Sequence, residues 1–63
     1  MRYYVILTKG NREKVIRAFE SQSEAVRFGK SYFSKLQPGD GVITIEDIRE
    51  GDPQHRIVSG WHF

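Results

Sequence analysis

The pattern of apolar and polar positions predicts two strands at the start of the chain. Residues 2–8 are rich in aromatic and β-branched side chains, which are typical of strands, and residues 13–19 form the second predicted strand. Gly10 and Asn11 lie between them and suit the positive φ angles of a two-residue hairpin turn. The chain is therefore expected to begin with an antiparallel β-hairpin.

After the hairpin, the period of the apolar positions changes from two to between three and four. Ser21 lies three residues before Glu24, which is the spacing of a capping box at the start of a helix. Apolar or small residues then recur at helical steps, which predicts an amphipathic helix of about sixteen residues. These residues are Ala25, Val26, Gly29, Tyr32, Phe33 and Leu36. Because Gly29 lies on this stripe, we expect the helix backbone to approach the sheet closely there.

Two further strands are predicted after the helix. Pro38 and Gly39 suit the central positions of a type II turn, and a third strand follows over residues 41–49. A fourth strand is expected over residues 55–63, with Trp61 packed beneath the helix.

These elements predict an α+β fold of order ββαββ in one compact domain, residues 1–63. The first and third strands are the most apolar and are therefore expected at the centre of the sheet. The sheet is then four-stranded and antiparallel, in the order 2-1-3-4, with the one helix packed on one face.

One helix covers only one face of such a sheet, yet both faces of the strands carry apolar residues. In a hairpin with a two-residue loop, Tyr4 would face Arg17 and Val5 would face Ile16. An uncovered apolar face usually marks an interface, so we expect a protein partner or a second copy of the chain to cover it. The residues predicted for this partner-binding face are Tyr4, Ile6, Val15 and Arg17. The alternative is that the twist of the sheet and its long side chains cover the face.

The distribution of charged residues suggests a second possible function. The net charge is only +2, but residues 1–36 hold eight Lys or Arg and three acidic residues. Cations mixed with aromatic residues on neighbouring strands could bind nucleic acid by base stacking and phosphate contacts. The residues of this alternative are Arg2, Tyr3, Lys14, Arg17, Arg27 and Lys30. The ribonucleoprotein signature is missing, and the helix cations also fit an ordinary solvated face.

Residues 45–55, IEDIREGDPQH, bring several carboxylates close to a histidine. Glu46 and Asp47 are neighbours on a predicted strand and therefore point to opposite faces. The two histidines, His55 and His62, are too few for a zinc site, and the sequence has no cysteine. Glycine, aspartate and proline at the centre of the stretch are typical of a turn. We therefore predict a hairpin turn, with no metal and no cofactor.

The remaining features exclude several classes of function. No apolar run approaches the ~20 residues of a membrane span, and no signal peptide or nucleotide-binding glycine pattern occurs. The sequence therefore predicts a cytoplasmic protein that is not an enzyme and has no small-molecule substrate. Our interpretation is a small binding module, an accessory regulator or inhibitor of the phage or mobile-element kind, that acts by occupying a protein partner and can self-associate.

Overall fold

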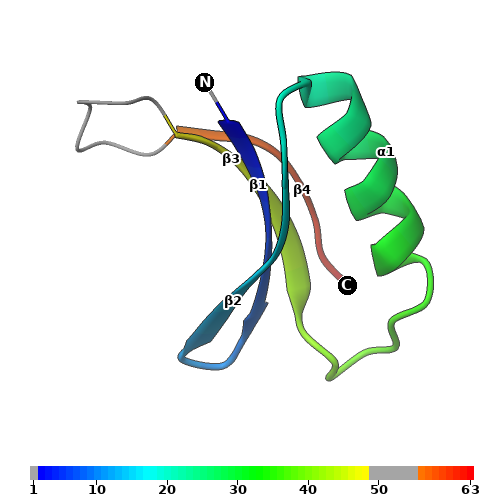
Figure 1. Cartoon of the computed structure of the whole chain (residues 1–63). Helices are drawn as coiled ribbons and strands as arrows, with labels where there is room; N and C mark the ends of the chain where they lie inside the picture. The colour runs from blue at the N-terminus through cyan, green and yellow to red at the C-terminus, as the bar shows by residue number, and fades with distance from the viewer. Residues whose placement is uncertain (1, 49–55) are drawn as a thin grey trace.

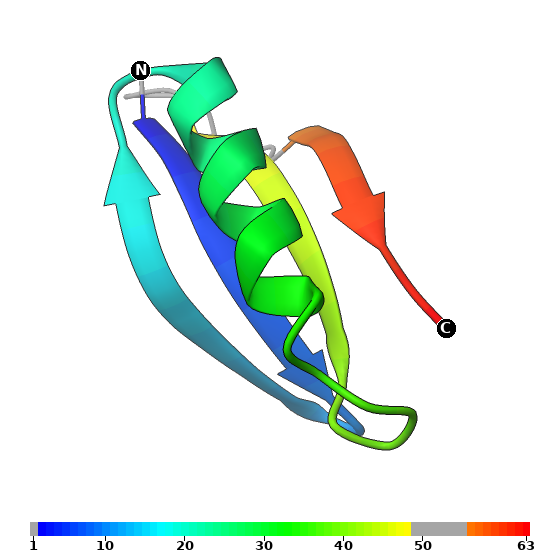
Figure 2. The same ribbon diagram turned by 90° about the vertical axis from the view of Figure 1, so that its right-hand side faces the viewer.

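The computed structural model describes residues 2–48 and 56–63 of the chain. Its elements are β1 (Arg2–Lys9), β2 (Arg12–Phe19), α1 (Gln22–Phe33), β3 (Val42–Ile48) and β4 (Arg56–Trp61). The strands form one antiparallel sheet in the order β2-β1-β3-β4, and α1 lies on one face of it (Figure 1). The predicted α+β fold and strand order are confirmed. Figure 2 shows α1 running over β1 and β3, with β2 and β4 at the two edges.

The hairpin between β1 and β2 closes through the predicted two-residue loop. Lys9 pairs with Arg12, so Gly10 and Asn11 form the turn. Of these two turn residues, only Gly10 has a positive φ angle, +62°, as in a type II′ turn with glycine at its first central position. This turn sets the register of the hairpin as far as Ile6.

Beyond Ile6 the register of β2 shifts by one residue. The observed pairs are Ile6 with Val15, Val5 with Arg17, and Tyr4 with Ala18. Ile16 is the extra residue of a β-bulge, in which two residues of one strand oppose one residue of its neighbour. The predicted pairs Tyr4–Arg17 and Val5–Ile16 are therefore wrong, because an unbroken alternation cannot anticipate the inserted residue.

The other edge strand, β4, carries a similar irregularity. Ile45 pairs with Ser59 and Glu46 pairs with Ile57, which leaves Val58 as the extra residue. Like Ile16 in β2, Val58 packs against the core beneath α1. A bulge bends its strand and increases the local twist. With one bulge in each edge strand, the sheet bends so that its face away from α1 is concave (Figure 1).

The helix is shorter than predicted, twelve residues rather than about sixteen. Ser21 is the N-cap residue, but its hydroxyl lies 2.9 Å from the Ser23 hydroxyl and caps no backbone amide, so the predicted capping box is wrong in its bonding. The helix ends at Phe33, and a tight turn then carries Leu36 to the edge of the core. Among the described residues, no helix is long and apolar enough to span a membrane.

The core lies between α1 and the two central strands. Its most buried side chains are Tyr3, Val5, Ala25, Ile43 and Ile45. At Gly29 the helix comes so close to the sheet that an added Cβ would lie 2.8 Å from Cζ3 of Trp61 and 2.9 Å from Cδ1 of Ile45. The predicted close approach at Gly29 and the packing of Trp61 against the core are both confirmed.

The connection from α1 to β3 contains the predicted turn. Gly39 has a φ angle of +99°, and the amide of Asp40 donates a hydrogen bond of 2.9 Å to the carbonyl of Gln37. The Asp40 carboxylate in turn accepts a hydrogen bond of 2.8 Å from the amide of Gln37. The turn directs the chain into the centre of the sheet at β3.

Candidate interaction surface

The face of the sheet opposite α1 carries side chains from all four strands, and we call it the open face. Residues of a strand alternate between the two faces, so the pairing assigns each residue to one side. The apolar members of the open face that matter below are Tyr4, Ile6, Val15, Ala18, Ile48 and Ile57. No described element covers this face, because α1 contacts the strands from the other side (Figure 1).

The centre and the edges of the open face differ in exposure. Ile6, on a central strand, is only 5% exposed. Val15 on β2 is 52% exposed and Ile57 on β4 is 64% exposed. The twist and the side chains of the sheet therefore cover its centre, whereas apolar side chains remain accessible at both edges.

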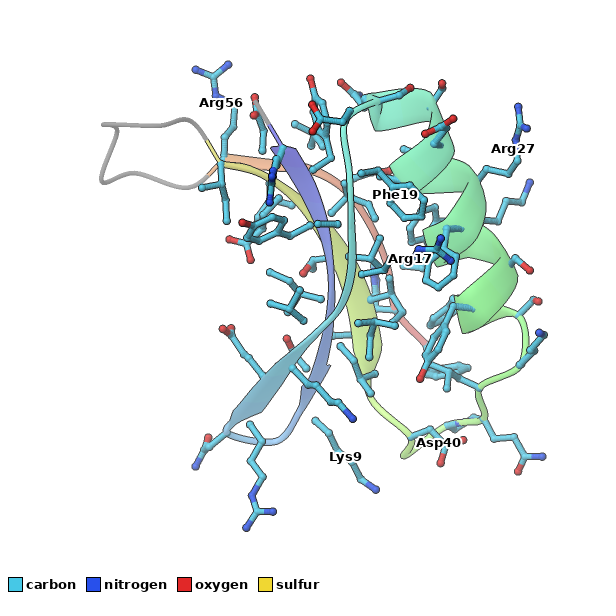
Figure 3. All side chains as sticks on the ribbon, viewed as in Figure 1. Lys9, Arg17, Phe19, Arg27, Asp40 and Arg56 are labelled. Carbon is cyan, nitrogen blue, oxygen red and sulfur yellow. The ribbon has the colours of Figure 1, made fainter. Side chains whose placement is uncertain are left out.

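Three of the four residues predicted for the partner-binding face lie on the open face, and Arg17 does not. The bulge at Ile16 turns Arg17 to the side of α1. There its guanidinium lies 5.2 Å from the ring centroid of Phe19 and 5.6 Å from that of Phe28, between strand and helix (Figure 3). The expectation that Arg17 shares a face with Tyr4, Ile6 and Val15 is thus wrong.

The structure does not bring the residues of the nucleic-acid alternative together. Tyr3 is 9% exposed and belongs to the core, so its ring offers no surface on which a base could stack. Arg27 points away from the sheet, whereas Arg17 points between β2 and α1 (Figure 3). Lys30 lies about 200° around the helix from Phe28, which packs against Phe19 on the β2 side.

The other two residues of that alternative lie at opposite ends of the sheet. Arg2 begins β1, where it pairs with Glu20 at 3.9 Å. Lys14 lies opposite Leu7, towards the hairpin turn. The six residues therefore form no single basic surface.

The acidic stretch can be located only in part, since Glu50, Asp52 and His55 lie outside the described residues. The prediction that Glu46 and Asp47 point to opposite faces is confirmed: Glu46 is on the open face, and Asp47 is buried on the helix side at 6% exposure. Within residues 2–48 and 56–63, no three metal-capable side chains converge. Asp47 continues the alternation of Ile43 and Ile45 on the helix side, but a carboxylate at this position does not by itself predict burial.

A surface pocket of about 410 Å³ lies where the hairpin turn meets the loop before β3. Thr8, Lys9, Gly10, Gly39, Gly41, Val42 and Phe63 line it. Lys9 is the one ionisable side chain of this lining.

Comparison of the chain with protein-family models, with curated proteins and with solved structures finds no significant match. We therefore infer function from the surface of the molecule alone.

Proposed function

We propose that the protein is a non-enzymatic binding module that holds a partner protein against the open face of its sheet. One observation carries the proposal: the open face holds apolar side chains from every strand, and no described element covers it. Interface centres are poor in charged residues and rich in apolar and aromatic ones. A cytoplasmic regulator or inhibitor would act in this way.

The distribution of charge supports a protein partner over a polyanion. The β2 cations Lys14 and Arg17 pair with Leu7 and Val5, so they belong to the helix side of the sheet. The open face carries instead the carboxylates of Glu13 and Glu46, and its cation Arg2, opposite Ile48, lies 3.9 Å from the carboxylate of Glu20. An acidic and apolar face repels phosphates and attracts a partner surface that is apolar with basic residues beside it.

The shape of the face favours a helix as the partner element. The sheet is concave on this side (Figure 1), and its other face already packs against an amphipathic helix, α1. A second amphipathic helix with basic residues beside its apolar stripe would complete a helix–sheet–helix sandwich, an established way of burying both faces of a sheet.

Matched variants of a tagged protein test this proposal. Proteins that bind the wild type would be identified by mass spectrometry and purified, and their affinities measured by calorimetry. Val15→Lys places a charge on the exposed edge of the open face, and Ser31→Lys places the same charge on the exposed side of α1. Ile6 is unsuitable, because a charge at a position 5% exposed would also unfold the protein.

We expect Val15→Lys to weaken binding at least about tenfold, the range of a residue that matters to an interface, and Ser31→Lys to leave it within about twofold. Equal affinities of Val15→Lys and wild type would refute the proposal, as would a loss confined to Ser31→Lys. If the wild type binds only itself, and Val15→Lys abolishes that, the face serves self-association instead.

A further inference from the structure

The two edges of the sheet differ in chemistry. In the sheet formed by the described residues, β2 and β4 each pair on one side only, so each leaves a row of backbone amides and carbonyls without a strand partner. Proteins protect such edges from other strands mainly with charged side chains and bulges. Both edges have a bulge. The two edges differ, however, in how many of their side chains are charged.

The β2 edge is protected by charge. Four of its eight residues are charged and exposed, and they are spread along the strand: Arg12, Glu13, Lys14 and Arg17. An incoming strand would have to desolvate these groups or place its own charges opposite them. We therefore expect no strand to add at β2.

The β4 edge has no such protection. Arg56 begins the strand, and the five residues from Ile57 to Trp61 are all uncharged. Of the three large apolar side chains that are exposed in the described structure, Ile57 belongs to β4, and Phe63, 54% exposed, follows it two residues after Trp61. The centroid of the Phe63 ring lies 4.7 Å from that of Phe33 at the end of α1. The apolar surface beside β4 therefore continues onto the helix.

We propose that β4 is a dimerisation edge, which pairs antiparallel with β4 of a second copy about a two-fold axis. The register that we assign places Val58 of each copy opposite Ser59 of the partner subunit. An interface of this kind is isologous, so one self-complementary segment suffices to build it.

The bulge makes β4 complementary to itself in this register. Because Val58 is the extra residue, Arg56, Val58, Ser59 and Trp61 all lie towards the helix side, whereas Ile57 and Gly60 lie on the open face. The two-fold axis then joins residues of the same face. Arg56 meets Trp61 of the partner subunit, and Ile57 meets Gly60 of the partner subunit. In a strand without a bulge, the same pairing would place residues that point to opposite faces of the sheet across from one another.

These pairs are chemically favourable. A guanidinium beside an indole forms a cation–π contact. An exposed isoleucine opposite a glycine covers backbone that would otherwise face water. No like charges oppose one another, because Arg56 is the one charged residue of the strand and lies at its end.

The dimer would have one continuous eight-stranded sheet. A two-fold axis between antiparallel edge strands runs perpendicular to the sheet, so both α1 helices lie on one side and both open faces on the other. The interface lies at the β4 edge of the open face, where Ile57 and Gly60 belong to it, and the dimer would present the rest of that face in two copies side by side. Because a single strand pair buries less than a standard interface, we expect a reversible dimer.

The test is the molecular mass of the full chain by light scattering and sedimentation at increasing concentration. For the wild type we expect the mass to rise from the 7.3 kDa of one chain towards twice that value. Ile57→Lys and Val15→Lys make the same kind of change at opposite edges of the same face, and circular dichroism checks that both fold. We expect Ile57→Lys to raise the dissociation constant at least about tenfold, since each change occurs twice across the axis, and Val15→Lys to change it less than about twofold.

A direct measurement makes the test independent of the variants. In a dimer of one isotope-labelled and one unlabelled copy, filtered nuclear Overhauser spectra should connect the methyl groups of Ile57 with the α protons of Gly60 in the other copy. A wild type that remains monomeric up to about 1 mM, far above the dissociation constants of specific complexes, would overturn the proposal. Equal weakening by both variants would also overturn it, because that result indicates dimers joined through their open faces. The first result would not bear on whether a foreign protein binds the open face, whereas the second would show that a second copy of the chain occupies that face.

Discussion

Substitution of Gly29 by alanine tests the packing on which the whole fold depends. In an exposed position, glycine to alanine stabilises a helix by about 1 kcal/mol. At Gly29 the new methyl group would lie 2.8 Å from the Trp61 ring and 2.9 Å from the Ile45 side chain, closer than carbon atoms approach without strain. Helix propensity and core packing therefore act in opposite directions at this one residue.

The structure indicates which effect is larger. Overpacking a core by one methyl group costs about 1–3 kcal/mol, because side chains must leave their preferred rotamers. Trp61 and Ile45 are held on β4 and β3, and Ile45 is fully buried, so neither can withdraw freely. After the gain in propensity, we expect Gly29→Ala to lower the free energy of unfolding by about 1 kcal/mol, or the melting temperature by about 4–8 °C in a domain of this size.

Urea unfolding followed by the fluorescence of Trp61, the one tryptophan, gives this free energy. Comparison of Ser31→Ala with Ser31→Gly measures helix propensity at an exposed position of the same helix. In addition, Ile45→Val should cost less in the Gly29→Ala background than in the wild type, because it removes the Cδ1 atom that the new methyl group meets. If Gly29→Ala stabilises the protein as much as alanine does at residue 31, the close helix–sheet contact is refuted.

Three further substitutions address the turn before β3 and the packing of β2 against α1. Gly41 and Gly39 both have positive φ angles, but a Cβ at Gly41 would lie 2.7 Å from the Thr8 carbonyl oxygen, whereas Gly39 has open space around it. We expect Gly41→Ala to cost about 2–4 kcal/mol and Gly39→Ala about 1–2 kcal/mol in urea unfolding; equal costs would contradict the contact with β1. Arg17→Met keeps the aliphatic part of the side chain over Phe28 and removes the cation, so we expect a loss of about 0.5–1 kcal/mol. An unchanged midpoint would show that the guanidinium adds nothing to the packing between β2 and α1.

The elements and their order could be predicted because they depend on local patterns. Alternating apolar residues in residues 2–8 and the helical repeat around Gly29 each agree with the structure, as does the glycine at the first hairpin turn. The two most apolar strands lie at the centre, since burial on both sides is available only there.

The bulges could not be predicted, and they decide which residues reach the surface. In the sequence, Val15 and Ile16 look like two consecutive positions of one alternation, and nothing marks Ile16 as an insertion. Its placement depends on the core beneath α1, which accepts Ile16 in β2 and Val58 in β4. For this reason the alternation predicts the wrong face for Arg17, whereas the register set by the hairpin turn predicts the correct face for Val15.

The most direct test of the account is a map of the partner's footprint by nuclear magnetic resonance. Amide and methyl shifts of the labelled protein would be followed while the purified partner is added. We predict changes at Tyr4, Val15 and Ala18 on the open face, and none at Arg27 and Ser31 on the outer side of α1. A footprint on α1, with the resonances of the open face unchanged, would contradict the proposed function.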